Sequence, residues 1–331
     1  MALEHSSPSS SCPFGGGAGE VRFSGRRDVM KPTSGAWDLV RCQGKNCTAL
    51  WLEPMPDEAP PGVPPRGFAK IAFGLIARVQ HAYLHMRYGY ADPQARPGFG
   101  WVMAVAAHLS SRKQAEWDVS VMHLPTHASG RLLNVGCGSG KSIASIRDRG
   151  WEVSGCDFNE KAVARSRLLD VGIGGIEAQR YEPERFDVVT LSRVIEHVPD
   201  PRQTLREYWR ILKNSGELVI TTPNTALLAH RIFKGKWMHL DTPRHLHLIA
   251  GAPLLVLVRE CGFAQARAFT TVWGADLQYY FSHMIARSGR NSMVVPPARR
   301  MILPSLFAFL ESLALRFLPA AEEELVVIAT K

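Results

Sequence analysis

Three glycines spaced Gly136-x-Gly138-x-Gly140 follow a short apolar segment. Glycine lets the backbone turn sharply and approach a ligand closely, because it carries no Cβ. A helix-like stretch comes next, and then a second apolar segment, 151–156, that ends at Asp157. An acid after the second strand of a parallel pair accepts hydrogen bonds from ribose hydroxyls. The pairing therefore predicts a nucleoside site at the carboxyl ends of two parallel strands.

The glycine spacing separates the candidate nucleosides. A pyrophosphate loop has its last glycine three residues after Gly138, and Lys141 stands there instead. Asn-Val-Gly-Cys-Gly-Ser-Gly, with Gly-Cys-Asp downstream, resembles the S-adenosylmethionine (SAM) site of class I methyltransferases; NAD and an unrelated glycine turn are the alternatives. The resemblance implies SAM contacts from Asn134, Gly136, Cys137, Gly138, Gly140, Asp157, Phe158 and Ser192. Cys137 is interpreted as a small loop residue, not a nucleophile.

Apolar segments alternate with helical ones from residue 131 onward. Helix signals are Asn159 as N-cap for 160–170, Asp200-Pro201 before the next helix, and Pro253 opening a helix that stops at Gly262. One helix face is expected to hold Leu205, Tyr208, Trp209 and Leu212. Expected strands are 131–135, 151–156, about 175–180, 186–191, 217–222, about 263–272 and 324–330. The alternation predicts a doubly wound α/β fold with a mostly parallel, seven-stranded sheet, and the family resemblance implies an antiparallel last strand.

We expect three regions along the chain. A zinc-ribbon-like segment covers 1–60, a helical linker region with helices at 66–90 and about 100–117 covers 61–127, and a SAM-dependent methyltransferase domain covers 128–331. There are 39 basic and 30 acidic residues, a net charge of +9. This charge permits an acidic substrate, nucleic acid or an anionic membrane and selects none of them.

The chain is expected to be cytoplasmic. It lacks a signal-peptide pattern at its start and an apolar run of about 18 residues that would cross a membrane. Six cysteines in so long a chain do not form a disulfide framework.

Three further motifs follow the glycine loop in the order that methyltransferases have. Residues 186–201 resemble the fourth-strand motif and 212–224 the fifth-strand motif, with Asn214-Ser215-Gly216 as the turn. Residues 237–248 are similar to a subgroup of bacterial methyltransferases associated with sugar, lipid or secondary metabolism. The order of these motifs is more specific than the glycine loop alone.

Glu196-His197 resembles a pair in ubiquinone-type O-methyltransferases, where a further Glu three residues earlier helps to bind a divalent metal. Arg193 stands at that earlier position, and its positive charge disfavours a cation. No metal is therefore predicted at this site. For His197 two interpretations stay open: a structural hydrogen bond at a strand-to-helix turn, or a lining residue of the acceptor pocket.

A polar cluster of His239, Asp241, Arg244, His245 and His247 lies after the fifth strand. Three interpretations stay open: a lid loop whose His and Arg side chains pair with the backbone or with Asp241, an acceptor contact that includes a general base, or a metal site. His245 is the candidate base, because histidine titrates near physiological pH. Arg244 is a candidate partner for an acidic group on the acceptor.

Cys12, Cys42 and Cys47 are weak zinc candidates. Together with Trp51 and Pro-x-Pro they resemble the short zinc ribbon that precedes related methyltransferases, which has two Cys-x-x-Cys pairs. Gly15 stands in place of one cysteine, and a structural zinc site needs four ligands. His5 is a distant candidate for the fourth, so the ribbon is interpreted as degenerate.

An insertion at about 275–320 separates the last two expected strands. Its apolar stretch from Met301 to Leu318 is flanked by arginines. Three interpretations stay open: two helices packed on the domain, a wall of an apolar acceptor pocket, or peripheral contact with anionic lipid.

The sequence thus predicts a SAM-dependent methyltransferase for a small-molecule acceptor such as a sugar, lipid, quinone-like compound or secondary metabolite. Methyl transfer would be an in-line displacement in which positioning supplies much of the catalysis. An RNA methyltransferase and a catalytically inactive scaffold are the alternatives. No nucleic-acid partner is expected, because no clustered basic and aromatic face is evident. The sequence predicts neither the acceptor atom nor the oligomeric state.

Overall fold

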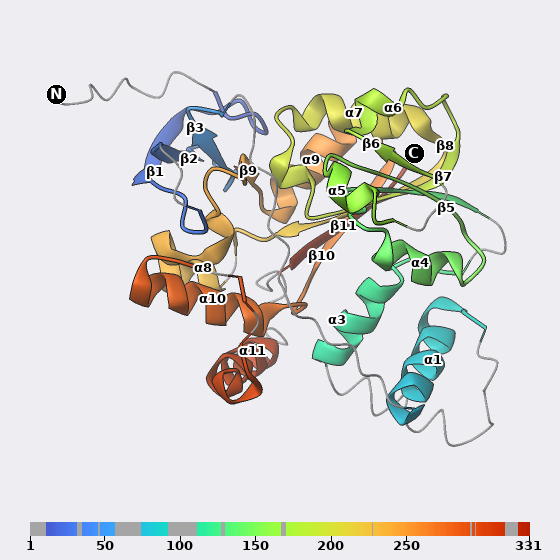
Figure 1. The fold of residues 1–331 in the computed structure, drawn as a ribbon. Helices are drawn as coiled ribbons and strands as arrows, with labels where there is room; N and C mark the ends of the chain where they lie inside the picture. Colours follow the sequence, from blue (N-terminus) through green and yellow to red (C-terminus); the bar gives the residue numbers. More distant parts are fainter. Residues whose placement is uncertain are drawn as a thin grey trace.

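A computed structural model describes residues 11–31, 35–45, 47–56, 74–91, 111–126, 130–166, 170–226, 228–291, 293–294, 296–314 and 324–331. Its larger sheet has seven strands in the order β10-β11-β8-β7-β4-β5-β6 (Figure 1). In chain order these are β4 (Arg131–Val135), β5 (Glu152–Asp157), β6 (Val171–Ile173), β7 (Phe186–Ser192), β8 (Leu212–Pro223), β10 (Gln265–Thr271) and β11 (Glu324–Thr330). The predicted α/β fold is confirmed.

The strands from β4 to β8 are parallel, whereas β11 runs antiparallel to both of its neighbours, β8 and β10. The antiparallel strand expected at 324–330 is therefore present. The chain moves from β4 outward to β5 and β6, and then returns to the other side of β4 with β7. Such a reversal opens a crevice at the carboxyl ends of the strands, where ligands bind in doubly wound sheets.

Helices on the sheet begin where the sequence signals predict them. Asn159 caps α5 (Glu160–Val163) by accepting a hydrogen bond from the Ala162 amide, and Asp200 caps α7 (Pro201–Ile211) by accepting one from the Gln203 amide. The other helices of this part are α4 (Lys141–Arg147), α6 (Ile176–Gln179) and α9 (Gly251–Glu260).

Three details of the prediction are wrong. Helix α5 ends at Val163 rather than near 170, and residues 176–179 form a helix, so that the third strand is β6 at 171–173. The apolar face predicted after Asp200 is also shorter. Leu205 and Tyr208 are buried, but Trp209 is exposed and Leu212 begins β8. Helix α7 ends at Ile211, one residue before the predicted Leu212, because the chain continues directly into β8.

A second sheet joins the N-terminal segment to the loop after β8. It contains β1 (Gly19–Arg26), β2 (Trp37–Cys42), β3 (Leu50–Glu53) and β9 (His247–Leu248), all antiparallel (Figure 1). Strand β9 pairs Trp51 with His247 and Leu50 with Leu248. Two segments about 200 residues apart in sequence therefore share one sheet.

The remaining helices are α1 (Gly74–Tyr88), α3 (Ser111–Ser120), α8 (Leu228–Phe233), α10 (Ala275–Ser288) and α11 (Ile302–Ala314). The first two correspond to the helices expected at 66–90 and about 100–117, although 57–73 and 92–110 lie outside the described residues. In the insertion, α10 and α11 pack together at one end of the molecule (Figure 1). Within the described residues, no helix is long and apolar enough to cross a membrane.

Candidate functional site

The glycine loop turns away from β4 in the left-handed region of backbone space. Gly136, Gly138 and Gly140 have φ values of 72°, 55° and 72°. A Cβ on Gly136 would lie 2.4 Å from Cγ2 of Val194, so this position has neither the backbone freedom nor the room for a side chain. A Cβ on Gly138 would meet nothing within 4 Å, so the loop backbone is open there to a close ligand.

Asp157 lies at the carboxyl end of β5, directly beside this loop. Its Oδ2 accepts a hydrogen bond of 2.7 Å from the Gly138 amide, and its Oδ1 accepts one of 2.7 Å from the Asn159 amide. Two amides thus fix the carboxylate before any ligand binds, while each oxygen keeps a free lone pair. The structure brings the predicted loop and the predicted acid together.

The other predicted donor-site residues lie around the same strand ends. Asn134 is buried and donates to Oγ1 of Thr190 at 2.8 Å, so its side chain joins β4 to β7. Cys137 is buried, and burial raises the pKa of its thiol to about 11, which agrees with a small, unreactive loop residue. Phe158 is 77% exposed beside Asp157, and Ser192 ends β7. Contact of these residues with SAM stays a prediction.

Two candidate histidines meet beyond the end of β7. The ring centroids of His197 and His245 lie 4.8 Å apart in an edge-to-face arrangement. Nδ1 of His197 lies 2.8 Å from the Arg244 carbonyl, and Nδ1 of His245 lies 2.7 Å from the His239 carbonyl. A carbonyl only accepts, so Nδ1 carries the proton in each neutral ring and Nε2 is left as an acceptor. The predicted structural hydrogen bond of His197 is present.

Glu196 adds a carboxylate to this pair. Its Oε2 accepts from Oγ1 of Thr222 at 3.0 Å, while its buried Oε1 has no partner among the described residues. One ligand atom from each of Glu196, His197 and His245 lies within 4.8 Å of the others, which is a donor set that suits a divalent cation. Arg193 lies nearby in an ion pair with Glu324 at 3.1 Å, and its charge still opposes a cation.

Burial makes His245, the predicted base, a poor proton acceptor. Burial and the neighbouring His197 lower the pKa of His245 to about 3, so its ring stays neutral and is a weak base near pH 7. His239 is also buried, and burial lowers its pKa well below the ordinary value. His197 is only half-buried.

Arg244 pairs with Asp241, as the lid-loop interpretation predicts, and not with an acceptor. Its side chain is fully buried, and its two terminal nitrogens each lie 2.8 Å from an oxygen of Asp28. Nε also donates to Asp241 at 3.0 Å. Burial opposes ionisation of Asp28, but the hydrogen bonds from Arg244 and two amides lower the net pKa of this carboxyl. Arg244 is therefore committed to internal partners and cannot also serve as the anchor for an acceptor.

The three N-terminal cysteines come together in the smaller sheet region. The Sγ atoms of Cys12, Cys42 and Cys47 lie within 4.8 Å of one another, with 3.7 Å between those of Cys12 and Cys47. The Gly44 amide donates to Sγ of Cys42 at 3.3 Å. A Cβ built on Gly15 would lie 3.5 Å from Sγ of Cys47, so Gly15 borders the cluster where a fourth ligand is missing. His5 lies outside the described residues.

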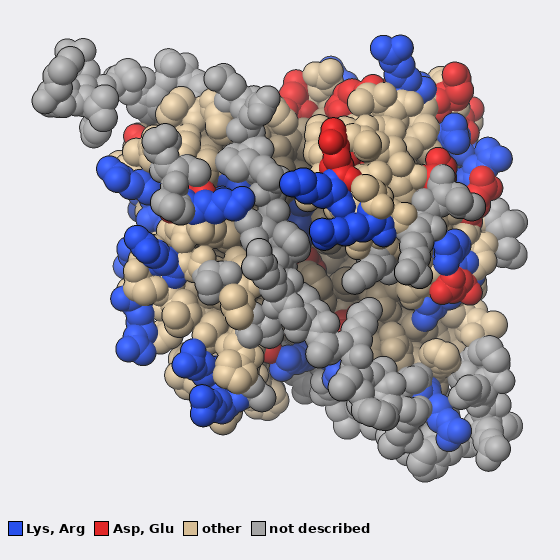
Figure 2. All heavy atoms as spheres, in the orientation of Figure 1, with Lys and Arg blue, Asp and Glu red and all other residues tan. Residues whose placement is uncertain are grey.

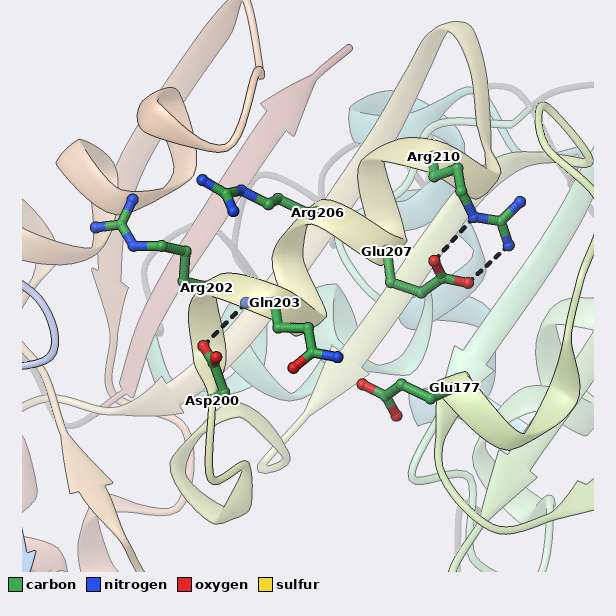
Figure 3. Close-up of a pocket in the computed structure, with 7 residues that line it drawn as sticks. All are labelled: Glu177, Asp200, Arg202, Gln203, Arg206, Glu207 and Arg210. Carbon is green, nitrogen blue, oxygen red and sulfur yellow. Dashed lines mark hydrogen bonds and ion pairs between the residues drawn. The ribbon is translucent and has the colours of Figure 1, made fainter.

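A surface pocket of about 500 Å³ lies elsewhere, along α7 (Figure 3). Its walls are mostly charged side chains. Figure 3 shows that Arg210 pairs with Glu207 and that the backbone amide of Gln203 donates to Asp200. No residue of the glycine loop or of the histidine pair lines it. Its position and composition separate it from the site built at the strand ends.

The part of the chain that forms the site at the strand ends matches a known protein family. Residues 109–267 match the family model described as a methyltransferase domain. This part of the chain is a methyltransferase domain. The match includes the glycine loop, Asp157, Glu196 and both histidines, and it excludes the three cysteines, α10 and α11.

Curated relatives of the methyltransferase domain carry the name ubiquinone biosynthesis O-methyltransferase. The protein from Pseudomonas entomophila is 36% identical over 133 residues, which cover 36% of this chain and 56% of that protein. The protein from Pseudomonas fluorescens (strain Pf0-1) is 38% identical over 106 residues, 29% of this chain and 46% of that protein. The chain therefore spans about half the length of the curated relatives it matches.

Solved structures of low sequence identity are also similar. A SAM-dependent methyltransferase from Mesorhizobium loti is 19% identical with a TM-score of 0.46, covering 66% of this chain and 98% of its own. A possible histamine N-methyltransferase from Thermotoga maritima is 16% identical with a TM-score of 0.45, covering 70% and 95%.

Proposed function

We propose that the methyltransferase domain binds SAM and transfers its methyl group to a small-molecule acceptor. The observation that carries the proposal is the fixed carboxylate of Asp157 beside the left-handed glycine loop. Backbone amides hold the acid at the carboxyl end of β5, where it is placed to accept hydrogen bonds from ribose hydroxyls. Lys141 stands where a pyrophosphate loop has its last glycine, which favours a nucleoside without a pyrophosphate.

The acceptor side of the site lies beyond β7. SAM carries an activated methyl group, so in-line attack by the acceptor atom transfers the methyl and releases S-adenosylhomocysteine. Placement of that atom supplies much of the rate enhancement. The names of the curated relatives favour an oxygen acceptor, and a hydroxyl group must lose its proton as the new bond forms.

We infer that His197 accepts this proton. Its Nδ1–H is held by the Arg244 carbonyl, which leaves Nε2 as the acceptor, and the ring is half-buried. His245 packs edge-on against it and orients the ring. The acceptor class follows the resemblance and the relatives: a quinone-like compound, a lipid, a sugar or a secondary metabolite.

Titration calorimetry with SAM tests the donor half of the proposal. We expect binding by the natural chain and a loss of roughly ten- to hundredfold in Asp157→Ala, because the ribose hydrogen bonds to a charged group disappear. Asp148→Ala is the matched control, since Asp148 is an exposed acid at the end of α4. No binding at millimolar SAM, or equal affinity in Asp157→Ala, would refute the proposal.

The acceptor half needs a metabolite screen with methyl-labelled SAM. With an accepted substrate, His197→Gln should lower kcat strongly and leave the affinity for SAM unchanged. An unchanged kcat in this variant would exclude His197 as the base while leaving SAM binding intact.

A further inference from the structure

Helix α11 exposes a continuous apolar face. Pro304 and Ala308 are buried on one side of the helix, where Ala308 packs with Val272 and Ala275. Large apolar side chains, spaced three, four and seven residues apart, lie on the opposite side of α11. These side chains are 44–71% exposed: Ile302, Leu303, Leu306, Phe307, Phe309 and Leu310. Phe307 lies at the edge of this face, where its ring stacks on Tyr279 of α10 with centroids 5.6 Å apart. Such a contiguous patch on a protein surface marks an interaction site rather than ordinary exposed apolar residues.

In the segment before this apolar face, every charged side chain is positive. Between residues 277 and 310 the sequence contains no aspartate or glutamate. Four arginines, Arg287, Arg290, Arg299 and Arg300, are exposed, and all lie on the segment from the last turn of α10 to the start of α11. Figure 2 shows basic side chains at the end of the molecule where α10 and α11 lie. An apolar helix face is thus joined to a concentration of positive charge.

We propose that α11, with the arginines before it, docks on the surface of an anionic lipid bilayer. An amphipathic helix with large apolar residues on one face and basic residues beside them lies in the headgroup region, with its apolar side chains buried about 5–10 Å deep. The arginines then contact the anionic headgroups. The surface does not cross the bilayer, which agrees with the lack of a spanning helix among the described residues.

The charge pattern favours lipid over a second copy of the chain. A two-fold interface places the same patch on both partners, so the two sets of four arginines would face each other, and each copy of α11 brings only one acid, Glu311. An anionic bilayer supplies the opposite charge. Helix α10, which packs on α11, also contacts the 3-10 turn Met238–Leu240, so it links the docking helix to the loop that carries His245.

Co-sedimentation with lipid vesicles tests the proposal on the full chain. Vesicles of phosphatidylglycerol and phosphatidylcholine in equal parts should bind the protein, and vesicles of phosphatidylcholine alone should bind it much less. Leu306→Asp, at the centre of the face, should weaken binding by about tenfold or more, because it removes buried methylenes and adds a negative charge. Arg299→Glu with Arg300→Glu should weaken it by at least about twentyfold, at roughly fivefold per arginine lost.

Two matched controls lie on other faces. Val256→Asp on α9 changes an exposed apolar residue, and Arg206→Glu on α7 reverses an exposed arginine. Both should keep natural vesicle binding, and thermal melting and SAM affinity should show that every variant is folded. Equal binding to neutral vesicles, or natural binding by Leu306→Asp, would overturn the proposal. So would a dimer in analytical ultracentrifugation that Leu306→Asp dissociates while the natural chain fails to bind vesicles.

Discussion

The buried pair of Asp28 and Arg244 predicts a large effect from a small substitution. Asp28→Asn keeps the size of the side chain but removes its charge and replaces one acceptor oxygen with a donor amide. Arg244 is fully buried, so water cannot replace the lost contacts. Two hydrogen bonds of 2.8 Å currently join its terminal nitrogens to the two oxygens of Asp28. The guanidinium would be left with Asp241 as its remaining charged partner.

The size of the effect follows from this burial. Removing one member of a buried ion pair costs about 3–5 kcal/mol, because the other charge stays buried without compensation. Asp241 still offsets part of the charge, so we expect about 3 kcal/mol, the lower end of this range. That is a large fraction of the 5–15 kcal/mol by which native proteins are typically stable. Urea unfolding followed by fluorescence measures the change in the free energy of unfolding.

A surface ion pair supplies the control. Arg147 and Asp148 are joined at 3.3 Å, but their side chains are 51% and 67% exposed, so Asp148→Asn should change stability by less than about 1 kcal/mol. Asp28→Asn should also leave SAM affinity unchanged, because the hydrogen bonds to Asp157 come from the Gly138 and Asn159 amides and not from this pair. A loss of stability no larger in Asp28→Asn than in Asp148→Asn would refute the reasoning.

Two further predictions concern titration and metal binding. Burial lowers the pKa of His123 to about 4, below the ordinary 6.5, so its contribution to stability is present above pH 6.5 and is lost as pH falls toward 4. From pH 7 to pH 5 this costs about 2 kcal/mol, and His123→Asn, which does not titrate and tolerates the left-handed backbone there, should flatten the measured slope by that amount; an unchanged slope would contradict it. Gly15→Cys should raise zinc affinity about a hundredfold in a competition with a chromophoric chelator, because a fourth thiolate adds roughly a quarter of the binding free energy of a four-ligand site. Gly15→Ser is the matched control, and equal affinities in the two variants would show that Gly15 does not border a metal site.

Local signals predicted most of the large sheet. Strands such as β4 and β7 are apolar runs buried on both sides, and their sequence shows it directly. The caps Asn159 and Asp200 were predictable because a cap acts within three residues of its own position. The glycine loop was predictable for the same reason, since its conformation depends on the glycines themselves.

Short or long-range features could not be predicted in this way. Strand β6 has three residues at the edge of the sheet and includes Gly172, so it lacks an apolar run to mark it. One of the two acidic partners of Arg244, Asp28, lies 216 residues away, in a segment rich in glycine, serine and arginine that carries no pattern of its own. The pairing with Asp241 was predictable because the two residues are three positions apart, whereas nothing near Arg244 in the sequence indicates Asp28.

Three contacts link the N-terminal segment to the backbone beside His197 and to the ring of His247. The Leu52 amide donates to the Leu246 carbonyl at 3.0 Å, and the Leu246 amide donates to the Glu196 carbonyl at 2.8 Å, so β3 is linked through one residue to the backbone beside His197. The ring of Phe14, close to Cys12, packs against His247 with centroids 5.3 Å apart.

The Asp28 pair holds Arg244, whose carbonyl in turn fixes the proton of His197 on Nδ1. The hydrogen bonds that hold the glycine loop and Asp157 come from β5 and from the turns beside them, and among the described residues none comes from the N-terminal segment. The N-terminal sheet therefore supports the part of the site in which we propose that the acceptor binds. Changes in it should alter which acceptor is methylated before they alter the binding of SAM.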